Sequence, residues 1–463
     1  MKDTVTSLLN RFKARDLSVK EYAEQVISNV EIFSDLGAIL EFDRDQLMID
    51  ADTADERWKS GLQGPLEGLM LGVKDNIDTS SLVTTAGTSV FNSPAPCNAP
   101  VLKVLLDQGA IVAAKTNLHE LAFGITSNNQ SKGAVHNPLK YGYIAGGSSG
   151  GTAAAVAAGI LPAGLGTDTG GSVRIPAALC GIAGFRPTTG RYLSGGIAPI
   201  SRTRDTIGAM AHTVTDLALL DATMARQNFS LGKRNIELLR IGVPRTVLWE
   251  DLDPGIAEGC QRILKTLSDA GVKLIEQDPA DIWTDCQNAS LPIALYETMR
   301  DLPEYAAYRG ITFDSLFKGI QSADVRSIIG SQLGEEKVPE AIYRESIDVL
   351  RPRMLSRWTE YFRKYDLDAV IFPTTPITAR PIGEDENVLV NGNLQPTFPT
   401  YTRNTDHGSV MGVPGISLPG GLVDGLPYGI ELEGLAGEDL ALLEVAKAIE
   451  QILAPVSETK ETL

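Results

Sequence analysis

The stretch from residue 141 to residue 200 most constrains how this chain can fold. Its 60 residues contain 15 of the 45 glycines of the 463-residue sequence, no histidine and only four charged side chains. The first 27 residues carry no charge. They are no membrane span, because a span needs about 20 mainly apolar residues and this stretch contains eight glycines and Pro162. Such a composition predicts elements that pack very closely inside a globular protein.

Two glycine-serine loops lie in this stretch, one around Ser148 (146–151) and one ending at Ser172 (166–172). Between them the sequence predicts a helix over 152–158 and a short strand over about 161–166. A helix runs away from its start and the next strand returns. Both serines should therefore lie at one edge of a sheet, near helix N-termini, where open α/β sheets bind their ligands.

The second loop also offers backbone donors. Glycine has no Cβ, so its N–H groups are accessible, and Pro176 suits the first turn of a following helix. We expect four N–H groups to converge there on an oxyanion, those of Thr169, Gly170, Gly171 and Ser172. Tight packing of helix on sheet explains glycines such as Gly164, but it does not explain two separate serine-bearing loops.

A serine nucleophile needs a base, and the nearest candidate is Lys74, which follows an apolar strand expected over 69–73. An ordinary lysine, with a pKa of about 10.4, is only about 0.04% neutral at pH 7. Burial can lower that pKa by several units, which would make a lysine base workable. A histidine base is the alternative to a lysine base. Residues 146–150 match the G-x-S-x-G elbow of α/β-hydrolases, and His407 lies late in the chain.

Short apolar strands alternate with helices through most of the chain, which predicts an α/β protein whose sheet is covered on both faces. The first sixty residues are expected to be helical, with a capping box at Ser18 and Glu21. We expect one domain over 1–463. Its parts would be N-terminal helices over 1–60, a core over 61–230 and a helical lobe over 285–366.

Composition excludes several classes of protein. The net charge of −17 disfavours binding to nucleic acid. Four isolated cysteines and an N-terminus without an apolar run favour a reducing compartment, the cytoplasm, and no membrane partner. The loops match neither a phosphate-binding GK[ST] loop nor a dinucleotide-binding G-x-G-x-x-G loop.

The run from Gly146 to Tyr192, preceded by GVKDNID at 72–78, resembles the amidase signature family over a long ungapped stretch. The resemblance is strong over about 60–230 and weaker through FPTTP (372–376) and PGISLP (414–419). It implies a mixed, multi-stranded sheet flanked by helices on both faces, with no cofactor and no metal. It also implies a catalytic triad with Ser172 as nucleophile, Ser148 as bridging serine after a cis peptide bond, and Lys74 as base.

The same resemblance implies an acyl-enzyme mechanism for hydrolysing an amide. Lys74 would take the proton of Ser172 through Ser148, and the loop N–H groups would hold the oxyanion. Asp168 and Arg174 could pair to support the loop.

The segments at 117–129 and 133–138 resemble a branch with bacterial indoleacetamide hydrolases and aryl-acyl amidases. The implied substrate is a small primary amide with an aromatic acyl part, such as indole-3-acetamide. Its pocket would include Phe123, Gly124 and Ile125.

Three alternatives remain. One is the glutaminase subunit of a tRNA-dependent amidotransferase, although Ile175 stands where that subunit usually has glutamine. The others are an amidase cleaving ureides or carbamates, and an α/β-hydrolase-type Ser-His esterase. The expected partner is a small amide, and a homodimer is left open.

Overall fold

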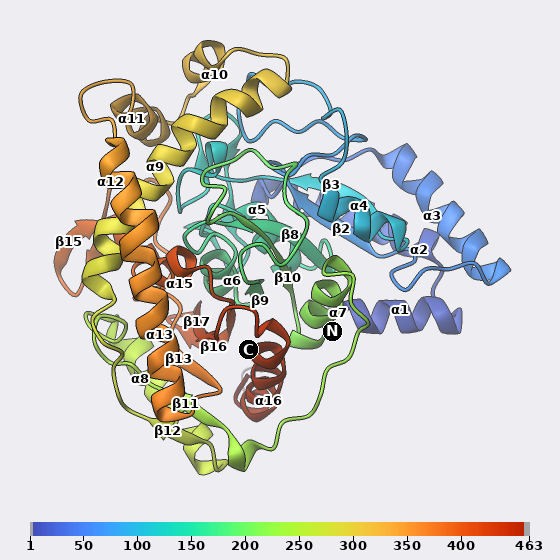
Figure 1. The fold of residues 1–463 in the computed structure, drawn as a ribbon. Coiled ribbons are helices and arrows are strands. Elements are labelled where there is room, and N and C mark those ends of the chain that lie inside the picture. The colour runs from blue at the N-terminus through green and yellow to red at the C-terminus, as the bar shows by residue number, and fades with distance from the viewer. Residues whose placement is uncertain (1–2, 458–463) are drawn as a thin grey trace.

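An eleven-stranded mixed sheet forms the centre of the molecule (Figure 1). The structure is a computed structural model that describes residues 3–457. From edge to edge the strands are β1 (Ile39–Glu41), β3 (Ile111–Thr116), β2 (Met70–Lys74), β8 (Ala163–Asp168), β10 (Thr206–Ala211), β9 (Ala183–Arg186), β16 (Gly415–Val423), β17 (Leu426–Glu433), β13 (Ala369–Pro373), β11 (Arg240–Gly242) and β12 (Lys273–Ile275). β2 is parallel to β3 and β8, β11 is parallel to β13 and β12, and the other pairs are antiparallel.

Helices cover both faces of this sheet because its strands are apolar on both sides. Along β2, Leu71 and Val73 belong to one buried cluster and Met70 to another, as the alternation of side chains in a strand requires. The helices of the first face are α4 (Pro100–Asp107), α7 (Val214–Met224), α8 (Pro254–Asp269) and α16 (Asp439–Ser457). Those of the other face include α2 (Val19–Ile32), α3 (Arg44–Ser60), α5 (Gly150–Ala157) and α6 (Arg174–Cys180). The predicted fold class is confirmed.

The N-terminal region is helical with one exception. Helices α1 (Val5–Ala14), α2 and α3 form as expected. The Ser18 hydroxyl accepts from the N–H of Glu21 at 3.1 Å while the Glu21 carboxylate accepts from the N–H of Ser18 at 2.8 Å. The expectation of helix throughout is wrong at β1, which pairs antiparallel with β3. A strand of three residues is too short to show alternation, and its hydrogen-bond partners lie some 75 residues away.

From residue 283 to residue 365 the chain is mostly helical, and it lies along one side of the sheet (yellow to orange in Figure 1). The helices are α9 (Trp283–Tyr308), α10 (Phe313–Gly319), α11 (Ala323–Ser331), α12 (Glu340–Glu345) and α13 (Arg351–Tyr365), with a π-helical turn over Ser346–Leu350. Helix α9 packs against α15 (Asp406–Met411), which brings this region close to the carboxyl end of β8.

The remaining elements are small. Three two-stranded ladders pair β4 (Asn128–Asn129) with β5 (Gly133–Ala134), β6 (His136–Asn137) with β7 (Lys140–Ile144), and β14 (Asn387–Val390) with β15 (Asn393–Pro396). The short helix α14 (Thr397–Thr402) follows β15. Within residues 3–457, no helix combines the length and the apolar character that crossing a membrane requires.

Candidate active site

A buried lysine and a buried serine meet where two parallel strands end. Lys74 is the last residue of β2, and its Nζ lies 2.8 Å from Ser148 Oγ and 2.8 Å from Thr167 Oγ1 on β8. Neither Lys74 nor Ser148 is exposed to solvent, and the Gly147–Ser148 peptide bond is cis. The carboxyl edge predicted from the sequence therefore brings these two side chains into contact.

Small residues make this approach possible. A Cβ on Gly164 would lie 2.5 Å from a methyl carbon of Thr152 on α5 and 2.9 Å from the carbonyl oxygen of Gly72 on β2. A Cβ on Gly166 would lie 2.7 Å from Ser149 Oγ. The glycines thus let α5 pack directly onto β2 and β8, with the loop that carries Ser148 at its N-terminus.

Burial changes the proton affinity of Lys74. Removal from water penalises the charged ammonium and lowers the pKa of Lys74 to about 7, although the carboxylates of Asp168 and Asp205 act in the opposite direction. At neutral pH about half of the molecules then carry a neutral amine, against about 0.04% for an ordinary lysine. The Lys74 amine can accept a proton at the pH of most cells.

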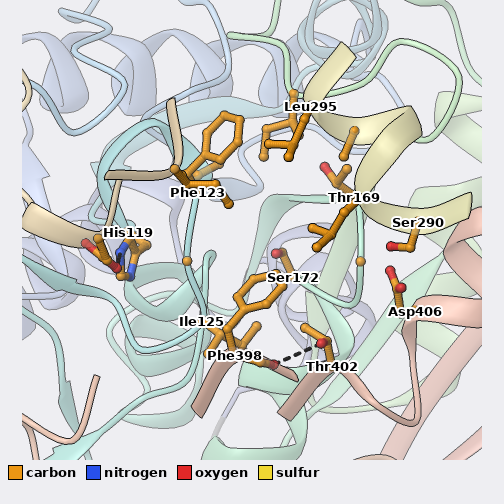
Figure 2. Close-up of a pocket in the computed structure, with 18 of the residues that line it drawn as sticks. His119, Phe123, Ile125, Thr169, Ser172, Ser290, Leu295, Phe398, Thr402 and Asp406 are labelled. Atoms are coloured by element: carbon orange, nitrogen blue, oxygen red, sulfur yellow. Dashed lines mark hydrogen bonds and ion pairs between the residues drawn. The ribbon is translucent and has the colours of Figure 1, made fainter. Parts of the chain in front are cut away.

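Ser172 stands at the wall of a cavity of about 180 Å³ (Figure 2). The Ser149 N–H donates to the Ser172 carbonyl at 3.3 Å, so the two serine loops lie side by side. Ser172 is 8% exposed. All three residues predicted for the pocket, Phe123, Gly124 and Ile125, line this cavity. The structure thus brings together both serines, Lys74 and the expected pocket wall.

The cavity is mostly apolar, with polar groups at its two ends. Its apolar wall includes Phe123, Ile125, Ile200, Ala294, Leu295, Ile328 and Phe398. In Figure 2, His119 lies on one side of Ser172, and Ser290 and Asp406 lie on the other. His119 Nε2 is 2.9 Å from Asp324 Oδ2 on α11. A Cβ on Gly124 would lie 2.2 Å from the same ring nitrogen, so this glycine makes room for His119.

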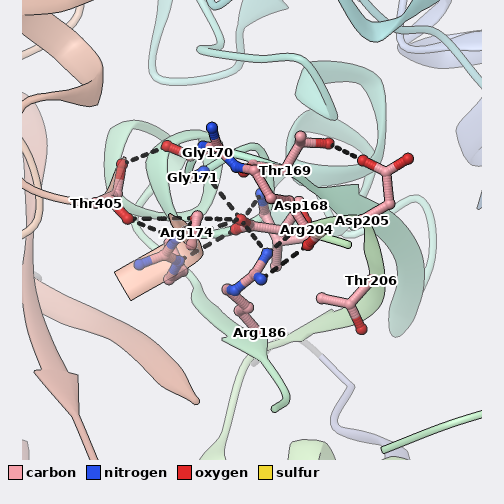
Figure 3. A network of polar contacts seen from close by, with 12 residues as sticks. Asp168, Thr169, Gly170, Gly171, Arg174, Arg186, Arg204, Asp205, Thr206 and Thr405 are labelled. Carbon is pink, nitrogen blue, oxygen red and sulfur yellow. Dashed lines mark hydrogen bonds and ion pairs between the residues drawn. The ribbon is translucent and has the colours of Figure 1, made fainter. Parts of the chain in front are cut away.

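Asp168, at the end of β8, organises the loop that carries Ser172 (Figure 3). Its carboxylate accepts from the N–H groups of Gly171 at 2.9 Å and Val173 at 3.2 Å. It also pairs with the buried guanidinium groups of Arg174 at 3.1 Å and Arg186 at 3.0 Å. Burial alone would raise the pKa of Asp168, but the two arginines hold that pKa well below its usual range. The expected pairing of Asp168 with Arg174 is present in the structure.

The four expected oxyanion donors are not equivalent. The N–H of Gly171 is already engaged by Asp168, which differs from the sequence-based expectation. Among the residues that the structure describes, the N–H groups of the other three, Thr169, Gly170 and Ser172, have no hydrogen-bond acceptor. Gly171 has a φ of +125°, and a Cβ there would lie 2.2 Å from Thr405 Oγ1. The Thr169 side chain, on the other side of the loop, donates to Asp205 at 2.5 Å.

Sequence reasoning missed several residues that support the site. Thr167 binds Lys74, and its own hydroxyl is contacted by Asn76 Nδ2 at 3.0 Å. Arg174 also pairs with Glu431 at 2.9 Å and Glu433 at 3.1 Å, both on β17. Thr167 and Asn76 stand beside the predicted residues, which was a usable signal. The two glutamates lie more than 250 positions away from Arg174, and no local pattern links them.

His407 is not placed as a base for either serine. It is buried among Trp283, Trp358 and Phe372, with Nε2 at 3.0 Å from Glu433 Oε2. It does not line the cavity that Ser172 borders. This placement disfavours the α/β-hydrolase arrangement. Nor, within residues 3–457, are three or more histidine, cysteine, aspartate or glutamate side chains grouped as metal ligands would be.

Comparison with known proteins agrees with this geometry. The family model named Amidase matches residues 21–443. An indoleacetamide hydrolase of Agrobacterium vitis is 41% identical, covering 97% of both chains. A mandelamide hydrolase of Pseudomonas putida is 38% identical, covering 97% of this chain and 91% of the relative. A crystal structure of an amidase superposes with a TM-score of 0.89 at 29% identity, covering 97% of this chain and 99% of that one.

Proposed function

The chain belongs to the amidase family and is an amide-hydrolysing enzyme, and from this premise we propose that it converts a small primary aryl-acetamide, such as indole-3-acetamide, to a carboxylate and ammonia. The catalytic residues in this proposal are Ser172, Ser148 and Lys74. The observation that carries it is the buried contact of 2.8 Å between Lys74 Nζ and Ser148 Oγ, beside a serine that opens onto an apolar cavity.

Proton transfer through Ser148 is the first step of the proposed mechanism. Neutral Lys74 takes the Ser148 hydroxyl proton while Ser148 takes the proton of Ser172. Ser172 Oγ then bonds to the amide carbon, and the carbonyl π electrons move onto oxygen. The N–H groups of Thr169, Gly170 and Ser172 are free donors available to that oxyanion. Gly171 could join them only by leaving Asp168.

Release of ammonia reverses the relay. The C–N bond breaks as the nitrogen takes a proton from Ser148, which is reprotonated by the Lys74 ammonium. Water then attacks the acyl ester of Ser172 and gives its proton to the same relay. The ester C–O bond breaks as the relay returns that proton to Ser172 Oγ, which frees the carboxylate. A Lys74 pKa of about 7 suits both directions, because the group can hold or release the proton near neutral pH.

The cavity supports an aromatic acyl group. Its small volume and its wall of aliphatic and aromatic side chains suit a flat apolar ring, with the amide directed toward Ser172. The relatives named as indoleacetamide and mandelamide hydrolases act on amides of that kind. A glutaminase would have to bind a charged amino acid, whereas Arg204 and Asp406, two charged residues of the cavity lining, already pair with each other.

An ammonia-release screen tests the substrate proposal. It should compare indole-3-acetamide, phenylacetamide, mandelamide, short aliphatic amides, ureides and glutamine. We expect the three aryl amides to have a kcat/KM at least tenfold above that of the others. A preference for glutamine or for a ureide would instead support one of the two alternative amidase functions. As a control for background hydrolysis, Ser172→Ala should release no ammonia from any of them.

A further inference from the structure

Arg204, in the loop that leads into β10, lies against the backbone of the Ser172 loop. Its side chain is 3% exposed and borders the same cavity as Ser172. Its Nε donates to the Thr169 carbonyl at 3.1 Å. One terminal nitrogen donates to the carbonyl of Ser290 on α9 at 2.9 Å, and the other pairs with Asp406 on α15. A single guanidinium thus ties the loop to two helices.

The contact with the Thr169 carbonyl sets the direction of the next N–H. The Thr169–Gly170 peptide bond is trans, so its C=O and N–H point in opposite directions. The Gly170 N–H therefore points away from Arg204, and it has no acceptor among the described residues. A cationic donor on the carbonyl also polarises the peptide unit, which makes that N–H a stronger donor.

The neighbouring groups of the loop are held by other partners. Thr405 Oγ1 donates to the Gly170 carbonyl at 2.7 Å, and Asp205 accepts from the Thr169 hydroxyl. The Gly171 N–H is bound to Asp168, so the Gly170–Gly171 peptide unit is held at both its carbonyl and its N–H. Arg204 binds the carbonyl of the Thr169–Gly170 peptide unit, which carries the Gly170 N–H.

We propose that Arg204 is a positioning residue for the oxyanion site, which holds and polarises the Thr169–Gly170 peptide so that the Gly170 N–H meets the developing charge. This inference rests on the proposed function. It differs from a purely structural role, because a residue that only attaches the loop to α9 would affect stability and substrate binding. A residue that orients an oxyanion donor acts mainly in the transition state.

Kinetics of Arg204→Lys and Arg204→Ala test this role, with indole-3-acetamide as substrate. Removing one oxyanion donor costs about 100- to 1000-fold in kcat, so misaligning one should cost about 10- to 100-fold. We expect that loss in kcat for Arg204→Ala, a smaller loss for Arg204→Lys, and a KM within about threefold of the wild type. Guanidinium ion, well below denaturing concentrations, should restore part of the kcat of Arg204→Ala.

A transition-state analogue adds a second readout. An arylmethylboronic acid forms a tetrahedral, anionic adduct with a serine hydroxyl, so its affinity reports on the oxyanion site. Both variants should bind it more weakly by about the factor lost in kcat, while their affinity for the arylacetate product stays near that of the wild type. The matched control is Arg202→Ala, two positions away and exposed, which should keep wild-type values.

The results separate the two proposals. A raised KM with unchanged kcat, or an unchanged affinity for the boronic acid, would overturn the role of Arg204 alone. If Arg204→Ala does not fold, as judged by thermal unfolding, the kinetics and boronate affinity of Arg204→Lys decide. The proposed function itself fails if the wild type releases no ammonia from any aryl amide, or if Ser172→Ala remains active.

Discussion

Lys74 Nζ lies 2.8 Å from Ser148 Oγ, and both side chains are closed off from solvent. In water such a lysine would almost always be charged, and a charged lysine cannot accept a proton. Here the strand that carries Lys74 ends inside the protein, between β3 and β8, so the side chain has no route to the surface. Placement at a strand end therefore gives Lys74 a nearly neutral pKa, in a chain with only four histidines.

The first prediction concerns pH. Because the pKa of Lys74 is lowered to about 7, and the neutral amine is the active form, kcat/KM should rise with pH and reach half of its maximum near 7. It should level off above about pH 8. Ammonia release measured from pH 5 to 9 at constant ionic strength checks this. A profile that is flat over that range, or that falls as pH rises through 7, would exclude Lys74 as the base.

The second prediction concerns Gly171. Alanine there would have to adopt a positive φ, at a cost of about 1–2 kcal/mol, and its Cβ would overlap Thr405. With about 1–3 kcal/mol for overpacking, Gly171→Ala should lower the free energy of unfolding by about 2–5 kcal/mol and reduce kcat. Gly190→Ala is the matched control, with φ +84° and open space around it. Equal losses in the two variants, measured by urea unfolding, would contradict the overlap.

The third prediction concerns the buried ion pairs of Asp168, next to the loop that carries Ser172. Asp168→Asn removes a carboxylate that faces both Arg174 and Arg186, and breaking a buried ion pair costs about 3–5 kcal/mol. The pKa of Asp168 is depressed, so the carboxylate stabilises the folded protein above about pH 4. This contribution to the free energy of unfolding is lost as the pH falls below that value. Urea unfolding at pH 7 measures it. Lys103→Ala, which loses an exposed pair with Asp107, should cost less than about 1 kcal/mol.

The fourth prediction concerns substrate size. Phe123→Ala removes an aromatic side chain from the cavity wall. Covering that side chain with substrate contributes about 1.5–3 kcal/mol to the binding free energy. The kcat/KM for indole-3-acetamide should fall about 10- to 100-fold, while that for acetamide should change less than threefold. Phe229→Ala, on an exposed side chain, is the control. If both substrates lose equally, Phe123 supports the loop and not the acyl group.

Local sequence patterns predict the two strands that end beside the site, because each is a short apolar run that ends in a polar residue. The strand expected over 69–73 forms over Met70–Lys74, and the one expected over about 161–166 forms over Ala163–Asp168. β2 and β8 are parallel neighbours in the sheet, although α4, β3 and α5 lie between them in the chain. The sequence alone therefore places Lys74 and the two serines at one edge of the sheet.

Contacts between distant segments could not be predicted. Arg204 pairs with Asp406 and Arg174 with Glu431, across 202 and 257 positions. Strand β10 lies at the centre of the sheet, yet its small residues show no alternation that would reveal it. The engagement of the Gly171 N–H by Asp168 depends on backbone geometry that composition does not encode. The domain division, the homodimer and the cytoplasmic location stay predictions.

Covalent labelling tests the central claim, that Ser172 is the nucleophile, most directly. A fluorophosphonate reacts with activated serines, and mass spectrometry of the digested protein locates the adduct. We expect one adduct, on Ser172, formed in the wild type at a rate that rises through pH 7. Ser172→Ala should be unlabelled and release no ammonia, with an unchanged melting temperature. An adduct on Ser148, or aryl-amide turnover by Ser172→Ala within tenfold of the wild type, would contradict the assignment.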